Sequence, residues 1–282
     1  MTREISLLAP AKVNFRLDVL RKRPDGYHDL RMIMQRVGLY DELHLAVTDT
    51  PGISLTCPGS HDIPIDDRNL AGKAARTILA AAGCDCGVRI TLRKNIPIAA
   101  GLGGGSSDAA AVLMGLNDLL GLGFSDERLR ELARPLGADV PFFVFREPAL
   151  AEGIGDRLTP LAGIPRLWLL LVNPGFGIST AWVYGNLGLT TDKVVAKLPF
   201  LYKSADDVCR ILANDLETVA LASYPLIGEI KKRLVAAGAA GALMSGSGAT
   251  VFGIFPDEAS AHAGLARFNA PPEWFTAVAP TI

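Results

Sequence analysis

Residues 97–111 have the glycine-rich sequence PIAAGLGGGSSDAAA. Four of the five residues from Gly101 to Gly105 are glycines, which reach positive φ and let a ligand approach the backbone closely. Residues 88–93 before it alternate between apolar and polar side chains, as in a half-buried strand. Residues 107–120 after it are typical of a helix that Gly121 ends. The sequence therefore predicts a strand, a glycine-rich turn and a helix in succession.

A glycine-rich turn before a helix is a candidate phosphate site. The first N–H groups of the helix and the positive end of its dipole favour an anion there. Ser106 and Ser107 add hydroxyls that can bond a phosphate oxygen or ligate Mg²⁺, and Ser107 is the candidate metal ligand. A purely structural turn is the alternative, but ordering four glycines costs much backbone entropy. We predict that the segment binds phosphate through Pro97, Gly101, Leu102, Gly103, Gly104, Gly105, Ser106 and Ser107.

Two familiar phosphate motifs do not fit this segment. The Walker pattern requires a Gly-Lys-Ser/Thr sequence, and no lysine follows these glycines. The dinucleotide pattern requires a glycine at its sixth position, where a count from Gly101 gives Ser106 and a count from Gly103 gives Asp108. A third type of phosphate site remains.

The composition excludes several classes of function. The chain of 282 residues is 49% hydrophobic and 20% charged, with a formal net charge of −1. Because basic residues are not in excess, the composition does not predict nucleic acid or a membrane surface as a partner. The four cysteines lack the spacing of a zinc site and indicate reduced thiols. The N-terminus has no apolar stretch of signal-peptide length, and no apolar run is long enough to span a bilayer. We expect a cytoplasmic protein.

Clusters of strands that do not alternate strictly with helices favour an α+β fold. Helices are predicted at 69–82, 125–134 and 225–237, and strands at 167–172 and 250–255. The glycine- and proline-rich stretch 153–165 is the best candidate for a domain boundary, which predicts domains at 1–158 and 159–282.

The string GLGGGSSDAA at residues 101–110 resembles the second motif of the GHMP kinases, which include galactokinase, homoserine kinase, mevalonate kinase and phosphomevalonate kinase. It is most similar to members whose alcohol substrate, a methylerythritol, carries a cytidyl diphosphate group. The resemblance implies ATP and Mg²⁺ as cofactors. It also implies an N-terminal lobe with a left-handed βαβ crossover, a C-terminal ferredoxin-like lobe and a cleft between them.

Two further segments supply a catalytic pair by the same resemblance. Residues 9–14, APAKVN, are similar to the family's first motif, which places Lys12 and Asn14 in the substrate site. Residues 136–142, LGADVPF, are similar to the segment that carries the catalytic aspartate, here Asp139. Phosphoryl transfer needs a group that accepts the proton of the attacking hydroxyl, and a cation that orients it and stabilises negative charge. Asp139 and Lys12 would take these roles.

The remaining expected site residues also come from the resemblance. Residues 243–250 contain Ser245, Gly246, Ser247 and Gly248, which match the third glycine motif. Tyr27 and His28 match the segment that recognises cytosine, Thr180 and Tyr184 lie in a stretch that supplies an aromatic wall, and Met34 occupies the place of the opposite aromatic wall. Asn69 matches a position near the nucleotide, but a helix N-cap is an equally good role for it.

Two alternative functions stay open at this point. The chain could phosphorylate a smaller alcohol, such as homoserine, a sugar or mevalonate, or it could be an inactive nucleotide-binding module on the same fold. The tyrosine and histidine at residues 27 and 28 favour the cytidyl substrate over the first alternative. Lys12, Asp139 and the serines favour an active enzyme over the second.

Overall fold

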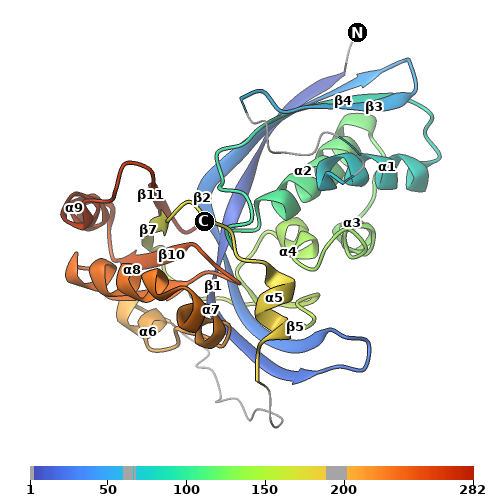
Figure 1. Cartoon of the computed structure of the whole chain (residues 1–282). Helices are drawn as coiled ribbons and strands as arrows, with labels where there is room; N and C mark the ends of the chain where they lie inside the picture. Colours follow the sequence, from blue (N-terminus) through green and yellow to red (C-terminus); the bar gives the residue numbers. More distant parts are fainter. Residues whose placement is uncertain (1–2, 60–65, 67, 189–201) are drawn as a thin grey trace. The chain divides into compact units, whose positions relative to one another are not determined.

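The computed structural model describes residues 3–59, 66, 68–188 and 202–282. The chain forms two compact units whose segments interleave along the sequence (Figure 1). Unit 1 consists of Met1–Ala11, Leu39–Ile96 and Gly103–Arg146. Unit 2 consists of Lys12–Gly38, Pro97–Leu102 and Glu147–Ile282. Mixed sheets with helices on them confirm the α+β prediction.

Unit 1 is a sheet with helices packed on one face. Strand β4 (Gly87–Arg93) pairs in parallel with β3 (Gly52–Thr56) and antiparallel with the later part of β2 (His28–Thr48). Its alternate residues Val88, Ile90 and Leu92 are buried, as their alternation predicts. Helices α1 (Leu70–Ala82) and α2 (Gly104–Leu120) lie side by side in unit 1, and α3 (Asp126–Ala133) and α4 (Val140–Phe145) complete it (Figure 1).

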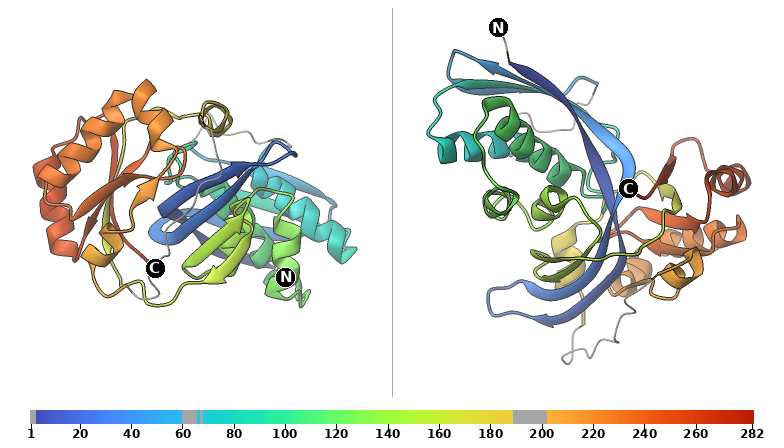
Figure 2. Two further views of the ribbon diagram at one scale, coloured as in Figure 1. Left: turned by 90° about the horizontal axis from the view of Figure 1, so that it is seen from below. Right: turned by 180° about the vertical axis from the view of Figure 1, so that it is seen from behind.

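Unit 2 contains an antiparallel sheet in the order β11-β7-β10-β9. Its strands are β7 (Trp168–Asn173), β9 (Gly241–Met244), β10 (Val251–Phe255) and β11 (Phe275–Pro280). Helices α8 (Pro225–Ala236) and α9 (Glu258–Phe268) cover one face of it (Figure 2). Numbered within this sheet, the strand order is 4-1-3-2 with two crossover helices, which is the ferredoxin-like arrangement that the resemblance implied.

The rest of unit 2 surrounds the hairpin of β1 (Glu4–Lys22) and β2. Residues 30–34 of β2 pair with β5 (Ala149–Gly153), which pairs with β6 (Arg157–Pro160). Arg16 and Leu17 of β1 pair in parallel with β8 (Ala213–Asn214). The described part of the unit also contains the short helices α5 (Thr180–Gly185), α6 (Ala205–Cys209) and α7 (Glu217–Ser223).

The predicted start of the helix after the glycines is three residues too late. Helix α2 begins at Gly104, inside the glycine run, and Gly103 is its N-cap residue with φ 72°. The prediction was wrong because glycine has a low helix propensity, whereas here the first helical turn is formed by Gly104 and Gly105 themselves. The other predicted helices and strands agree with the structure to within about two residues.

Candidate active site

The glycine-rich turn presents backbone donors at the start of α2. Ser107 N–H donates to the Gly103 carbonyl over 2.9 Å, which closes the first turn of the helix. The N–H groups of Gly104, Gly105 and Ser106 precede that bond and have no carbonyl acceptor within the helix. Gly105 is exposed and Ser106 is half-buried. The arrangement suits an anion such as a phosphate, and phosphate binding by this segment stays a prediction.

Asp139 lies in a turn next to this helix start, within unit 1. Val140 N–H donates to the Gly137 carbonyl over 3.1 Å, and Asp139 itself precedes the first residue of α4 and is half-buried. A Cβ atom added to Gly137 would lie 3.8 Å from Ser106 Oγ. The predicted proton acceptor is therefore on a segment adjacent to the phosphate turn.

Asn69 fills the structural role that the sequence left open. Its side chain accepts from Ala71 N–H over 2.9 Å at the N-cap of α1. An N-cap bond of this kind contributes about 1 kcal/mol to helix stability. A further role near the nucleotide stays a prediction.

Lys12 lies against the other half of the glycine-rich segment, in unit 2. Its backbone N–H donates to the Leu102 carbonyl over 2.9 Å, and its Nζ donates to Asn14 Oδ1 over 2.7 Å. Both side chains are almost fully buried. Lys12 belongs to unit 2, whereas Asp139 belongs to unit 1.

The third glycine motif packs on the same two segments. Ser245 Oγ donates to the Gly101 carbonyl over 2.9 Å. A Cβ atom added to Gly246 would lie 3.3 Å from Lys12 Nζ and 3.2 Å from the Gly101 carbonyl oxygen. Unit 2 thus brings together three motifs that are far apart in the sequence: Lys12, Gly101 and the residues 245–248.

Sequence reasoning missed two side chains that hold the third motif in place. Asn214 Nδ2 donates to the carbonyls of Met244 and Gly246, each over 2.8 Å, and Glu217 accepts from Met244 N–H over 2.8 Å. Asn214 is buried, so its amide would be costly to leave without these bonds. A lone asparagine in a polar stretch carries no signal of this role in one sequence.

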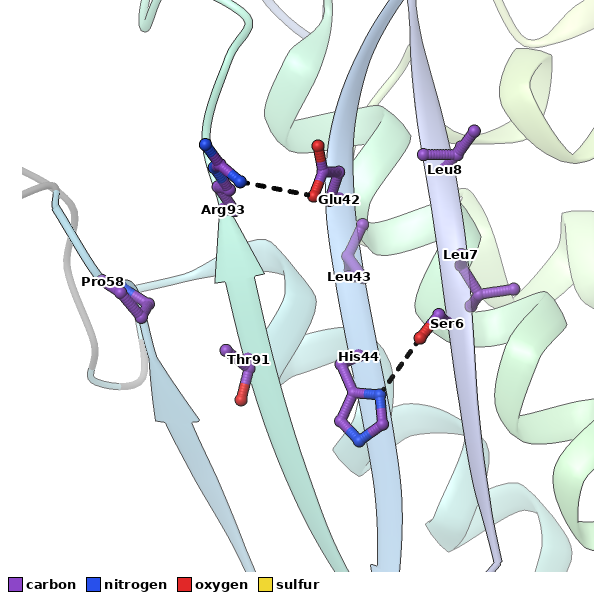
Figure 3. Close-up of a pocket in the computed structure, with 9 residues that line it drawn as sticks. All are labelled: Ser6, Leu7, Leu8, Glu42, Leu43, His44, Pro58, Thr91 and Arg93. Carbon is purple, nitrogen blue, oxygen red and sulfur yellow. Dashed lines mark hydrogen bonds and ion pairs between the residues drawn. The ribbon is translucent and has the colours of Figure 1, made fainter.

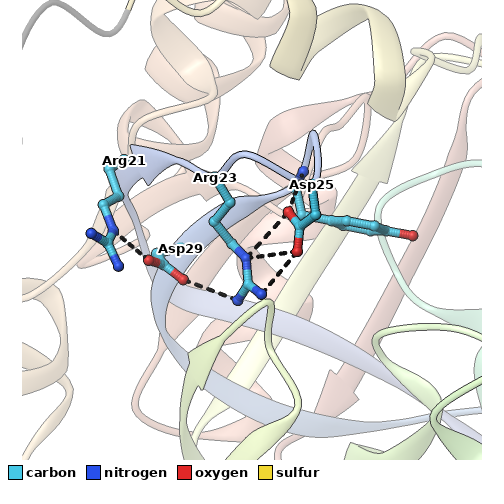
Figure 4. A network of polar contacts seen from close by, with 5 residues as sticks. Arg21, Arg23, Asp25 and Asp29 are labelled. Carbon is cyan, nitrogen blue, oxygen red and sulfur yellow. Dashed lines mark hydrogen bonds and ion pairs between the residues drawn. The ribbon is translucent and has the colours of Figure 1, made fainter.

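The predicted cytosine segment lies at the tip of the β1–β2 hairpin. Asp25 Oδ1 accepts from Tyr27 N–H over 3.1 Å, and Arg23 forms ion pairs with Asp25 and Asp29 (Figure 4). Arg21 pairs with the other oxygen of Asp29 over 2.6 Å. The network fixes the hairpin tip, from which Tyr27 projects with 60% of its surface exposed.

His28 and Tyr184 form a stacked pair in unit 2. Their ring centroids are 5.0 Å apart and their planes differ by 28°. Burial, followed by the charge of Lys22, lowers the pKa of His28, so its ring is neutral at pH 7. On the same helix as Tyr184, Thr180 Oγ1 bonds Ser247 Oγ over 2.8 Å, which connects α5 to the third motif.

Met34, expected as one wall of the substrate site, lies in β2. Its side chain has no exposed surface, and its backbone pairs with Ala149 of β5. The neighbouring Met32 accepts a weak hydrogen bond from Asn14 Nδ2 over 3.6 Å. In this structure Met34 is therefore part of the core, and a role at the substrate site stays a prediction.

A surface pocket of 550 Å³ lies elsewhere in unit 1, on the face of the sheet that carries Ser6, Glu42, His44 and Thr91 (Figure 3). None of the predicted site residues lines it. The pocket is therefore not part of the candidate site.

The described residues contain no group of three His, Cys, Asp or Glu side chains arranged to hold a metal ion. Ser107 Oγ is buried and has no hydrogen-bond partner among the described residues. Such an oxygen fits a hard cation that a bound nucleotide would bring with it.

No helix in the described ranges has the length and apolarity needed to cross a bilayer.

Comparison with known proteins gives two family matches. Residues 69–147 match the GHMP kinases N terminal domain, and residues 200–273 match the GHMP kinases C terminal domain. A 4-diphosphocytidyl-2-C-methyl-D-erythritol kinase from Geobacter sp. (strain M21) is 58% identical over 280 residues, which cover 99% of this chain and 100% of that protein.

Solved structures show the same relationship. A crystal structure of 4-(cytidine 5'-diphospho)-2C-methyl-D-erythritol kinase has a TM-score of 0.82 and 36% sequence identity, and the match covers 98% of this chain and 99% of that one. Homoserine kinase from Cytophaga hutchinsonii has a TM-score of 0.78 over 99% of this chain and 95% of its own, with 20% identity, so it shares the fold.

Proposed function

The chain belongs to the GHMP kinase family, and we propose that it transfers the γ-phosphoryl group of ATP to the 2-hydroxyl of 4-diphosphocytidyl-2-C-methyl-D-erythritol. The observation that carries the proposal is the full-length identity of 58% to a kinase of that name. The product would be the 2-phosphate, an intermediate of the non-mevalonate route to isoprenoids. A cytoplasmic location and a domain boundary near residue 158 are part of the same proposal.

Nucleotide binding is the first step of the proposed reaction. The phosphates lie against the N–H groups of Gly104, Gly105 and Ser106, where the α2 dipole favours negative charge. The segment from Pro97 to Gly103 approaches the nucleotide through backbone, and Asn69 lies near its base. Mg²⁺ held by Ser107 Oγ and the phosphates would neutralise charge that develops on the β- and γ-oxygens.

Transfer requires that the acceptor hydroxyl lose its proton. In the proposed mechanism Asp139 accepts this proton while the oxygen forms a bond to the γ-phosphorus, and the bond to the bridging oxygen breaks to release ADP. Lys12 stabilises negative charge on the transferred group. The bond from Lys12 Nζ to Asn14 Oδ1 supports this role, because it fixes the ammonium group beside the third motif.

The cytidyl group would be recognised by Tyr27, His28, Tyr184 and Thr180. A neutral His28 offers one donor and one acceptor to the edge of the base, and an aromatic ring offers a stacking surface. Met34 is proposed to belong to the same site by its place in the resemblance, and its side chain is fully buried.

A coupled ADP-release assay tests the proposal. We expect turnover with the cytidyl acceptor that exceeds turnover with homoserine, mevalonate or a simple sugar by at least about 10³-fold in kcat/KM, because buried polar contacts reject an acceptor that cannot pair with them. Phosphorus NMR of the product locates the new monoester. Faster turnover of a smaller alcohol, or no turnover of any acceptor, would refute the proposed substrate.

Replacement of Tyr184 by leucine tests the cytidyl site. We expect the KM for the acceptor to rise about tenfold with the KM for ATP unchanged, since stacking on a base is worth about 1–3 kcal/mol. Tyr184→Phe, which keeps the ring, should retain the wild-type value. Trp182→Leu is the matched control, because this neighbour on α5 packs edge-on against Tyr224 instead of His28. An unchanged acceptor KM in Tyr184→Leu would remove the residue from the site.

A further inference from the structure

Three charged side chains are buried together directly beneath the start of α2. They are Asp41 of β2, Lys94 after β4 and Asp108 in the first turns of α2, with 0%, 9% and 4% of their side-chain surfaces exposed. Lys94 Nζ forms ion pairs with both carboxylates, and its distance to Asp108 Oδ2 is 2.8 Å. All three residues belong to unit 1.

The cluster is connected to the backbone on both sides of the glycine-rich segment. Asp41 Oδ1 accepts from Asn95 N–H over 2.7 Å and from Ile96 N–H over 2.9 Å, so it fixes the chain as it enters the segment. Asp108 lies five residues after Gly103, in the helix that leaves the segment. Through its ion pairs with Asp41 and Asp108, Lys94 thereby links the backbone before the glycine-rich segment to the helix after it.

The cluster also lies against the turn itself. A Cβ atom added to Gly104 would be 3.1 Å from Lys94 Nζ and 3.2 Å from Asp41 Oδ2. A Cβ atom at these distances would be crowded, so the lack of a side chain at Gly104 lets the start of α2 lie close to the charged atoms. A shift of the cluster would shift the N–H groups of the turn.

Stability alone does not account for this cluster. Burial of charges carries a large desolvation cost, and an apolar replacement of similar volume is often as stable as a buried ion group. The cost is visible here: burial raises the pKa of Asp108 to about 7 against the attraction of Lys94, and Asp108 Oδ1 has no hydrogen-bond partner among the described residues. Hydrogen bonds of fixed direction, in contrast, define geometry in a way that apolar packing does not.

We propose that Lys94, together with Asp41 and Asp108, is a positioning group that holds the N–H groups of Gly104, Gly105 and Ser106 in the arrangement that binds the nucleotide phosphates. The three side chains act through the turn and do not touch the nucleotide. The proposal rests on the proposed kinase function only for the identity of the ligand, ATP.

The test compares variants by calorimetric titration with a non-hydrolysable ATP analogue and by steady-state kinetics. Asp108→Asn keeps an oxygen that accepts from Lys94, whereas Asp108→Ala removes it. The triple variant D41N/K94M/D108L removes every charge of the cluster and keeps its volume, and the amide oxygen that it introduces at position 41 still accepts the two backbone N–H groups. Asp126→Ala is the control, because it breaks an ion pair with Arg146 in the same unit at an exposed place.

We expect the analogue to bind about tenfold more weakly to Asp108→Ala and to the triple variant, because a displacement of about 1 Å in a binding group has effects of this size or larger. Asp108→Asn and Asp126→Ala should bind like the wild type, the KM for the acceptor should not change, and the triple variant should melt within a few degrees of the wild type. Wild-type nucleotide affinity in the folded triple variant would overturn the proposal. If that variant does not fold, equal affinities of Asp108→Ala and Asp108→Asn would overturn it.

The binding measurement separates this proposal from the proposed function. Failure of the wild type to phosphorylate the cytidyl acceptor would refute the substrate and leave the titration informative. Failure of the wild type to bind the ATP analogue would refute the nucleotide site and this proposal together.

Discussion

Replacement of Asp139 by asparagine is expected to lower kcat by about 10³-fold, the typical contribution of a general base, and to leave the affinity for ATP within about threefold of the wild type. Asparagine has the shape of aspartate but cannot accept the proton of the acceptor hydroxyl. The turn from Gly137 to Val140 should keep its structure, because its hydrogen bond joins backbone groups. Steady-state ADP release and titration with an ATP analogue measure the two quantities.

Lys12→Ala should cause a loss of similar size for a different reason. The substitution removes the cation beside Gly246 and leaves Asn14 Oδ1 without its donor, whereas the backbone bond from residue 12 to Leu102 remains. Lys12→Met, which keeps most of the side-chain volume, separates the loss of charge from the loss of packing. Lys203→Ala, in an exposed position of unit 2, is the control. A kcat near the wild-type value in Asp139→Asn or Lys12→Ala would remove that residue from the mechanism.

The variants Asp139→Asn and Lys12→Ala can be distinguished by the pH dependence of kcat. Loss of a general base should remove the acidic limb of the kcat profile, because the remaining activity no longer needs a deprotonated Asp139. Loss of Lys12 should lower kcat at every pH and leave that limb in place, because Asp139 is still present as the proton acceptor. Equal profiles in both variants would argue that they share a structural defect.

The sequence was most informative where local chemistry determines structure. The alternation of Val88, Ile90 and Leu92 predicted β4, and the helix predicted at 69–82 agrees with α1, whose C-cap residue Gly83 has φ 60°. The glycine-rich turn at residues 101–105 could be predicted as a candidate phosphate site, because several glycines directly before a helix have few other structural roles. Its boundary could not, because α2 begins at Gly104 although glycine has a low helix propensity.

The side chains that connect distant segments could not be predicted from one sequence. Lys94 and Asp41 are 53 residues apart, and neither lies in a motif. Asn214 reaches the third motif 30 residues later in the chain through a pairing between β8 and β1. Met34 was expected to form a wall of the site by its place in the resemblance, and one sequence does not show that its side chain is fully buried. These facts arise from tertiary packing, which local patterns do not encode.

Gly101→Ala is expected to reduce kcat/KM by about 100-fold or more, because it separates groups that must lie within about 1 Å of their places. Gly101 has φ +76°, a conformation that costs a residue with a side chain about 1–2 kcal/mol. The added Cβ would also lie 2.0 Å from the Ser245 carbonyl oxygen and 3.2 Å from Gly248 N, both backbone atoms. Relief of this overlap must move the glycine-rich segment away from the third motif.

The movement should be measurable in two ways. The melting temperature should fall, since the strain and the lost bond from Ser245 Oγ to the Gly101 carbonyl both act on the folded state. Gly228→Ala is the matched control in the same unit: it lies inside α8, its nearest neighbour would be Leu221 at 3.5 Å, and alanine favours a helix there. Wild-type kinetics in Gly101→Ala would show that the close contact between these two motifs is not needed for turnover. In that case the third motif would have to act on the reaction without the glycine-rich segment as its packing partner.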